Sequence, residues 1–285
     1  MKTTFKTLGG TPWRMYWTAV RAVLIRDFRV YLRYPGNAFF SIIEPFAWML
    51  PVVYMARAFS VDGRALGFQG YTGTTDFVSF YVVGGIISFY VSSVMWGIGF
   101  SLRNDMVNGV LETNWLTPVP PVVLLFGRSL WSLIQTTFRG IIAILIAGFA
   151  FRLSLHGGLW PALVALAPVL IGLYGLGFAL AAAVLLTNDA NNIIDMSNFL
   201  VGVLSGQQFP VQVLPRLLLS VSLILPITYG MDLVRGHLLG TTMLLPAGTE
   251  MNILLGVMVV FVLVGYVIFR MVERSVKSTG NLGFH

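Results

Sequence analysis

The sequence has no cysteine and few charged residues. Only 10% of its 285 residues are charged, whereas 56% are hydrophobic, and the mean hydropathy is +0.82. Because a soluble domain carries about 25% charged residues, this chain cannot cover a water-facing surface. These values argue against a soluble enzyme, a disordered tail and a nucleic-acid-binding protein, and they predict an all-α polytopic membrane protein.

The missing residue types also restrict the chemistry. Without cysteine, disulfide frameworks, thiol catalysis and thiolate metal sites are excluded. The three histidines, His156, His237 and His285, are far apart and give no local support to a clustered metal site. The chain contains no G-x-x-x-x-G-K-[ST], G-x-S-x-G or H-E-x-x-H motif. We therefore expect neither a catalytic site, nor a metal site, nor a cofactor bound by this chain.

Six apolar segments reach the length of about 20 residues that a membrane span requires. They lie at about 39–59, 77–101, within 122–151 (mainly its later part), 162–186, 193–209 and 253–271. A shorter apolar run at 217–225, between Pro215 and Pro226, predicts a re-entrant or interfacial hairpin. A seventh crossing is the alternative interpretation of that run.

The Lys and Arg residues of the short loops predict the orientation. Twelve of the 18 fall on the side that carries both termini, five fall on the opposite side, and Arg139 falls inside the third span. Both termini are therefore expected in the cytoplasm. The first residues lack the pattern of a secretory signal peptide, so we expect the N-terminus to be retained.

The expected organisation is a single membrane domain with cytoplasmic ends. A cytoplasmic segment at 1–37 precedes a six-helix transmembrane domain at 38–271, and a cytoplasmic tail follows at 272–285. The domain includes a cytoplasmic loop at 102–121 and an external re-entrant region at 210–250.

Residues 13–34 have the pattern of an amphipathic interfacial helix on the cytoplasmic leaflet. Its apolar positions recur every three or four residues and share one face; they are Trp13, Trp17, Val20, Leu24, Phe28 and Tyr31. Arginines fall mostly on the other face, where they meet anionic lipid. The Pro35-Gly36-Asn37 sequence is expected to end the helix. The helix is either a simple anchor or an elbow that moves with the first span.

The loop after the second span is polar and reads SLRNDMVNGVLETNWLTPVPP from residue 101 to residue 121. We expect residues 104–115 to form one short helix, with Asp105 near its positive N-terminal end. A helix lying across the cytoplasmic mouth suits a lever for a cytosolic partner.

This loop resembles that of the ABC-2 permease family, the membrane subunits of bacterial type-2 ABC exporters. The family pattern is acidic–x–GTLE–x–LL–TP, and here it stands as Asp105…Gly109-Val110-Leu111-Glu112…Leu116-Thr117-Pro118, with Val110 in place of threonine. A second resemblance, to SG…FP…LP…NPLTY…DxxR, covers residues 205–235, with Leu225 in place of asparagine. The order of elements also agrees over nearly the whole chain.

The resemblance implies partners and a mechanism. The chain is expected to pair with a second permease, identical or homologous, and to dock a cytosolic ABC ATPase in two copies. ATP and Mg²⁺ would then bind on the ATPase, because this chain has no nucleotide-binding loop. The ATPase-coupling residues would be Asn104, Asp105, Asn108, Gly109, Leu111 and Glu112.

The expected substrate is hydrophobic or amphiphilic: a drug, a lipid, or a lipid-linked glycan or polysaccharide. It would be exported across the bacterial plasma (inner) membrane, with membrane lipids as further partners and no nucleic acid. The predicted translocation pathway is lined by Ser88, Phe89, Tyr90, Ser92, Trp96 and Arg139. The same aromatic and small residues also suit plain helix packing, and Arg139 can instead snorkel or pair with a carboxylate.

Two further groups of residues have predicted roles. Gly202-x-x-x-Gly206 is a close-packing motif and a candidate for the dimer contact. Gln207, Gln208 and Tyr229 are candidates for an external gate, and the alternative is that they cap the hairpin by bonding its free backbone groups.

An ATP-independent secondary transporter or channel is the alternative function. Such a protein would use intramembrane charges as ion relays, and Glu44 in the first span and Arg139 are the candidates. Glu44 would otherwise be a hydrated residue near the boundary of the membrane. An intramembrane enzyme is a third class, for which no paired polar groups are evident.

Overall fold

The structure, a computed structural model, describes residues 12–58, 66–151, 153, 155, 157–187 and 190–279. Every regular element in these residues is helical. Those long and apolar enough to cross a membrane are α4 (Phe77–Val107), α6 (Pro121–Phe151), α7 (Leu159–Leu185) and α11 (Ala247–Thr279). These four helices agree with the predicted second, third, fourth and sixth spans. The third is longer than expected, because α6 is continuous from Pro121.

The other two predicted spans are helical but do not join these four. α2 (Pro35–Ala58) has 24 residues and carries Glu44 in its interior. α8 (Ala190–Leu204) has only 15 residues. At 1.5 Å per residue α8 is about 22 Å long, less than the hydrocarbon core of about 30 Å. A total of six crossings therefore stays a prediction.

The short apolar run between the fifth and sixth predicted spans is a bent pair of helices. α9 (Arg216–Ser222) and α10 (Pro226–Leu239) meet at 87°. The Thr228 hydroxyl donates to the Ser222 carbonyl at 2.7 Å, and the Tyr229 hydroxyl donates to the Leu223 carbonyl at 2.8 Å. These bonds satisfy backbone groups that the end of α9 leaves free. The bend has the shape of either a re-entrant hairpin or a broken span.

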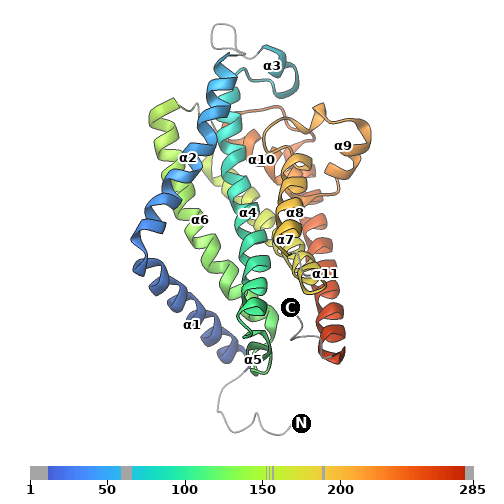
Figure 1. Ribbon diagram of the computed structural model, residues 1–285. Helices are drawn as coiled ribbons and strands as arrows, with labels where there is room; N and C mark the ends of the chain where they lie inside the picture. Colours follow the sequence, from blue (N-terminus) through green and yellow to red (C-terminus); the bar gives the residue numbers. More distant parts are fainter. Residues whose placement is uncertain are drawn as a thin grey trace.

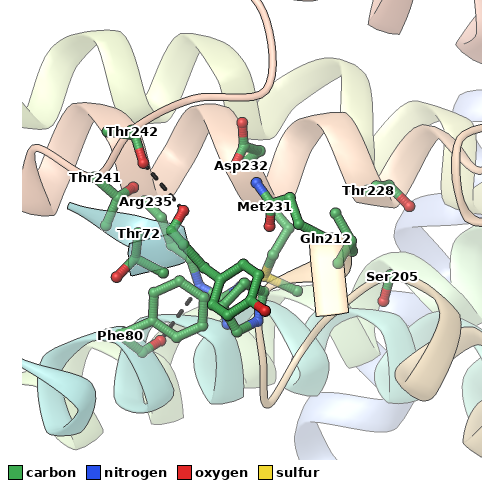
Figure 2. Close-up of a pocket in the computed structure, with 13 residues that line it drawn as sticks. Thr72, Phe80, Ser205, Gln212, Thr228, Met231, Asp232, Arg235, Thr241 and Thr242 are labelled. Atoms are coloured by element: carbon green, nitrogen blue, oxygen red, sulfur yellow. Dashed lines mark hydrogen bonds between the residues drawn. The ribbon is translucent and has the colours of Figure 1, made fainter. Parts of the chain in front are cut away.

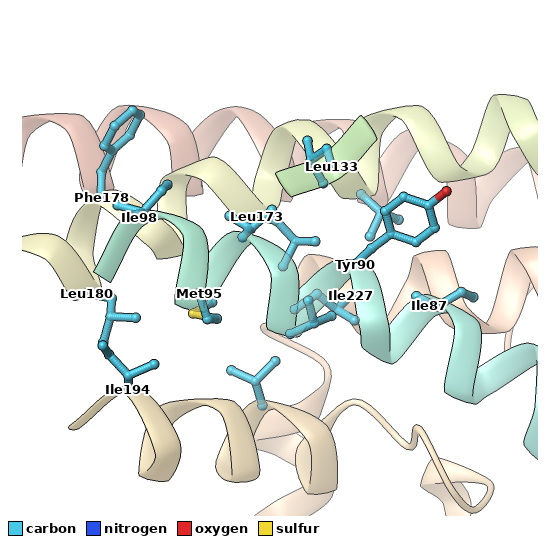
Figure 3. Packing of buried hydrophobic residues seen from close by; sticks show 14 of the residues in the cluster. Ile87, Tyr90, Met95, Ile98, Leu133, Leu173, Phe178, Leu180, Ile194 and Ile227 are labelled. Carbon is cyan, nitrogen blue, oxygen red and sulfur yellow. The ribbon is translucent and has the colours of Figure 1, made fainter. Parts of the chain in front are cut away.

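The core is organised around α4. Buried side chains of α4 pack against α6, α7, α8 and α10. Figure 3 shows this packing for Ile87, Tyr90, Met95, Ile98, Leu133, Leu173, Ile194 and Ile227. α7 and α11 lie so close together that a Cβ added at Gly265 would overlap the carbonyl group of Gly175.

The predicted amphipathic helix is α1 (Pro12–Arg33), which is separated from α2 by the single residue Tyr34. Its apolar face packs partly on α6, where the rings of Phe28 and Tyr31 meet Trp131 edge-on at 5.8 and 6.0 Å between centroids. Trp13 remains 75% exposed. The apolar face is therefore shared between the bundle and the surroundings, as expected for an interfacial helix.

The ends of the bundle carry different elements (Figure 1). The start of α1, the short helix α5 (Leu111–Trp115) and the end of α11 lie at one end. The helix α3 (Leu66–Thr72) and α9 lie at the opposite end. The predicted cytoplasmic and external elements are thus separated as the expected orientation requires.

Candidate functional site

The loop after α4 does not form the single helix expected over 104–115. α4 continues to Val107, and α5 begins only at Leu111. The break lies at Gly109, which has φ +65°, a left-handed conformation that glycine adopts without strain.

The backbone around this break forms a Schellman motif. The Gly109 N–H donates to the Met106 carbonyl at 3.1 Å, and the Val110 N–H donates to the Asp105 carbonyl at 3.0 Å. This pattern closes the last turn of a helix and redirects the chain. The prediction of one helix was therefore wrong because Gly109 acts as a helix stop.

The position of Asp105 is also opposite to the one expected. It lies in the last turn of α4, where the helix dipole disfavours a carboxylate. Arg128 of α6 compensates: its Nη1 donates to Asp105 Oδ2 at 2.8 Å, and the two side chains are only 15% and 11% exposed. Asn114 Nδ2 of α5 donates to the same oxygen at 2.9 Å, and Arg128 Nη1 also donates to Ser101 Oγ at 2.6 Å.

These four residues, Ser101, Asp105, Asn114 and Arg128, form the Asp105 cluster. One carboxylate thereby joins the end of α4, the short α5 and the start of α6. Asn114 and Arg128 were not among the predicted coupling residues. In the sequence, Arg128 is an isolated arginine near the start of an apolar span. Because such an arginine needs a partner of opposite charge, the sequence already indicates an interaction at this position.

The predicted coupling residues divide into two groups. Leu111 is 2% exposed and packs into the core, which anchors α5. Asn104, Asn108 and Gly109 are exposed at the end of the bundle. The side chain of Glu112 lies outside the described residues.

A cavity of about 360 Å³ lies between α2, α4 and α6. Four of the six predicted pathway residues line it: Phe89, Ser92, Trp96 and Arg139. The remaining lining residues are Glu44, Ser93, Ser132, Gln135 and Thr136.

The other two predicted pathway residues face elsewhere. The Ser88 hydroxyl donates to the Gly84 carbonyl of its own helix at 2.8 Å. The Tyr90 hydroxyl donates to Thr137 Oγ1 at 3.0 Å, beside a separate apolar cavity of about 230 Å³.

A buried arginine, Arg235, joins three parts of the chain away from the Asp105 cluster, and Figure 2 shows it beside Phe80. Arg235 of α10 is 3% exposed, and its guanidinium lies 3.5 Å from the centroid of the Phe80 ring. Its nitrogens donate to the carbonyls of Phe80 at 3.3 Å, Gly206 at 2.7 Å and Gln207 at 2.5 Å. Arg235 thus ties α10 to α4 and to the turn after α8.

Gly202-x-x-x-Gly206 does not lie within one helix, although the predicted fifth span at 193–209 included both glycines. α8 ends at Leu204, and Gly206 has φ +69°. The Gly206 N–H donates to Val203 and the Gln207 N–H donates to Gly202, both at 3.3 Å, which is the same helix ending as at Gly109. A role of this segment in a dimer contact stays a prediction.

The gate candidates have different environments. Gln207 is buried and Gln208 is exposed. Tyr229 bonds the end of α9, which is the capping role. Among the described residues, no group of three or more His, Asp or Glu could hold a metal ion.

Comparison with known proteins identifies the family. The model of the family described as ABC-2 type transporter matches residues 18–239, which is most of the chain and includes the Asp105 cluster, the polar cavity and Arg235. No single curated protein matches the chain in sequence. The apolar helices and this match together show that the chain is a multi-pass membrane protein that belongs to the ABC-2 type transporter family, as the permease component of an ABC transporter.

Proposed function

We propose that this permease is the transmembrane subunit of an ATP-driven exporter. A separate cytosolic ABC ATPase, in two copies, docks on α5 and on the turn at Gly109. Two permeases, identical or homologous, form the pathway by which a hydrophobic or amphiphilic substrate leaves across the bacterial plasma membrane. ATP and Mg²⁺ bind to the ATPase.

The observation that carries this proposal is the Asp105 cluster. α5 has five residues, which is too short for an isolated helix to be stable in water. It is held by buried Leu111 and by the Asn114–Asp105 bond. A displacement of α5 therefore passes directly to α4 and α6, without a flexible segment between them.

Exposed residues beside the cluster provide the surface for the ATPase. Asn104, Asn108 and Gly109 are all exposed next to α5. ATP binding closes the two ATPase subunits, and the closed form must bind one permease conformation more tightly than the other to drive the shift.

Replacing Asp105 with asparagine is expected to weaken the coupling between permease and ATPase without dissociating the complex. The Asp105→Asn change keeps the shape but removes the charge that Arg128 binds. Since a hydrogen bond to a charged group contributes about 1.5–3 kcal/mol, ATP hydrolysis by the complex in liposomes should fall about tenfold. The matched control is Asp195→Asn, at an exposed carboxylate of α8, which should hydrolyse ATP at the parent rate.

Replacing Gly109 with proline is expected to abolish docking. Proline fixes φ near −65°, which is incompatible with the φ of +65° at this position, so α5 must move. Co-purification of the ATPase from lipid should be lost, while the permease stays folded. If the ATPase binds equally well to Gly109→Pro and Glu112→Arg variants, the docking surface is elsewhere. If the permease alone carries ion-coupled flux in liposomes, the secondary-transporter alternative holds.

A further inference from the structure

The cavity between α2, α4 and α6 contains two opposite charges that do not bond to each other. Arg139 belongs to α6 and Glu44 to α2, and both line the cavity. Neither forms an ion pair within the described ranges. The Arg139 Nε is buried and has no hydrogen-bond partner there. The side chain of Glu44 is exposed. Since a charge within a membrane span costs about 3 kcal/mol on insertion scales, an arginine in this position is stabilised by a partner of opposite charge, and Glu44 is open to a partner from outside the chain.

The remaining walls show which partners fit. A guanidinium binds phosphate or carboxylate oxygens through two parallel hydrogen bonds. A carboxylate and aromatic faces both attract an ammonium group, and Glu44, Phe89 and Trp96 line the same cavity. The hydroxyl and amide side chains from α4 and α6 make the rest of the lining polar.

A ligand with a single charge would satisfy one of these groups and be repelled by the other. We propose that the cavity binds the zwitterionic head group of an amphiphilic substrate, with its anionic group on Arg139 and its cationic group between Glu44 and the two aromatic rings. This assignment rests on the transport function proposed above. A zwitterion satisfies both charges and brings no net charge into the membrane.

The dimensions and surroundings suit this ligand. The cavity volume of about 360 Å³ lies in the range of small-ligand sites, about 300–1,000 Å³. Beside Glu44, α2 exposes the apolar side chains of Phe39, Phe40 and Ile43. These give the hydrocarbon part of an amphiphile an apolar surface to lie against, outside the polar cavity.

The test measures binding to the purified permease alone, in detergent. The probe is a phosphocholine with one short acyl chain that ends in a fluorophore, read by anisotropy. Matched probes carry only a phosphate or only a trimethylammonium group. We expect the zwitterion to bind most tightly, and Arg139→Gln and Glu44→Gln each to weaken its binding about tenfold. Arg139→Lys, which keeps the charge but loses the paired donors, should recover only part of the affinity.

Ser88→Ala and Arg216→Gln serve as controls, because neither residue lines the cavity. Thermal midpoints of all variants show that a loss of binding is not a loss of folding. If Glu44→Gln binds the phosphocholine as well as the parent does, or if the phosphate probe binds most tightly, the zwitterionic assignment is overturned in favour of an anion. If no probe binds, the assignment also fails. The ATPase is not needed here, so that failure leaves the docking experiments unaffected.

Discussion

A single methyl group added at Gly265 is expected to separate α7 from α11. The Cβ of a Gly265→Ala variant would overlap the carbonyl group of Gly175, and the atoms in the way are backbone atoms that cannot rotate aside. Overpacking of a close-packed interior costs about 1–3 kcal/mol and sometimes more. Because α7 and α11 share the largest helix–helix contact in the described bundle, we expect the upper part of that range and a large fall in the thermal midpoint in detergent.

The same substitution at Gly256 provides the matched control. Gly256 lies on the same helix, but a Cβ there would meet no atom within 4 Å. Gly256→Ala should stabilise α11 slightly, since alanine is favoured over glycine in helices by about 0.5–1 kcal/mol. Equal midpoints for the two variants would contradict the close contact between α7 and α11.

Removing the Arg235 guanidinium is expected to have an effect of similar size at the other end of the molecule. An Arg235→Met variant keeps the length of the side chain but leaves the carbonyls of Gly206 and Gln207 without their donors. Leaving a buried acceptor without its donor costs about 1–3 kcal/mol for each group. Lysine should restore little of this, because a compact ammonium cannot reproduce the planar fork of donors.

The rate of limited proteolysis after residue 204 and the thermal midpoint would together measure the effect of removing the Arg235 guanidinium. The turn that follows α8 should be cleaved faster in Arg235→Met than in the parent. An exposed arginine of α9, Arg216, supplies the control, and Arg216→Met should leave both readouts unchanged. An unaltered cleavage rate in Arg235→Met would show that the turn holds its shape without the arginine.

Long apolar runs made most of the bundle predictable from the sequence. α4, α6, α7 and α11 follow from length and hydropathy alone, and the period of apolar residues gave α1. The break between α9 and α10 follows from Pro226 in the same local way. In each case the signal and the structure occupy the same stretch of chain.

The apolar pattern of the sequence does not predict those features of the structure that depend on a single glycine or on a partner far away in the chain. The apolar pattern predicts that helices continue through Gly109 and Gly206, whereas a helix ends just before each of these glycines. Glycine just past a helix end is a known stop signal, so the sequence itself contains the information for both of these helix ends. The partners of Asp105 and Arg235 were not foreseeable, because they lie on other helices, up to 155 positions away for Phe80 and Arg235.

The two arginine contacts of α4 restrict how this helix can move. Arg235 binds its carbonyl at Phe80 and Arg128 binds its carboxylate at Asp105, two points about 38 Å apart at 1.5 Å per residue. A tilt of about 5° would displace one point by roughly 3 Å relative to the other. Such a displacement would break a hydrogen bond, because donor–acceptor distances stay between about 2.7 and 3.2 Å. When the end of α4 beside α5 moves, the turn after α8 must therefore move together with α4 as a rigid body. Otherwise the hydrogen bonds of Arg235 must break each time α4 tilts.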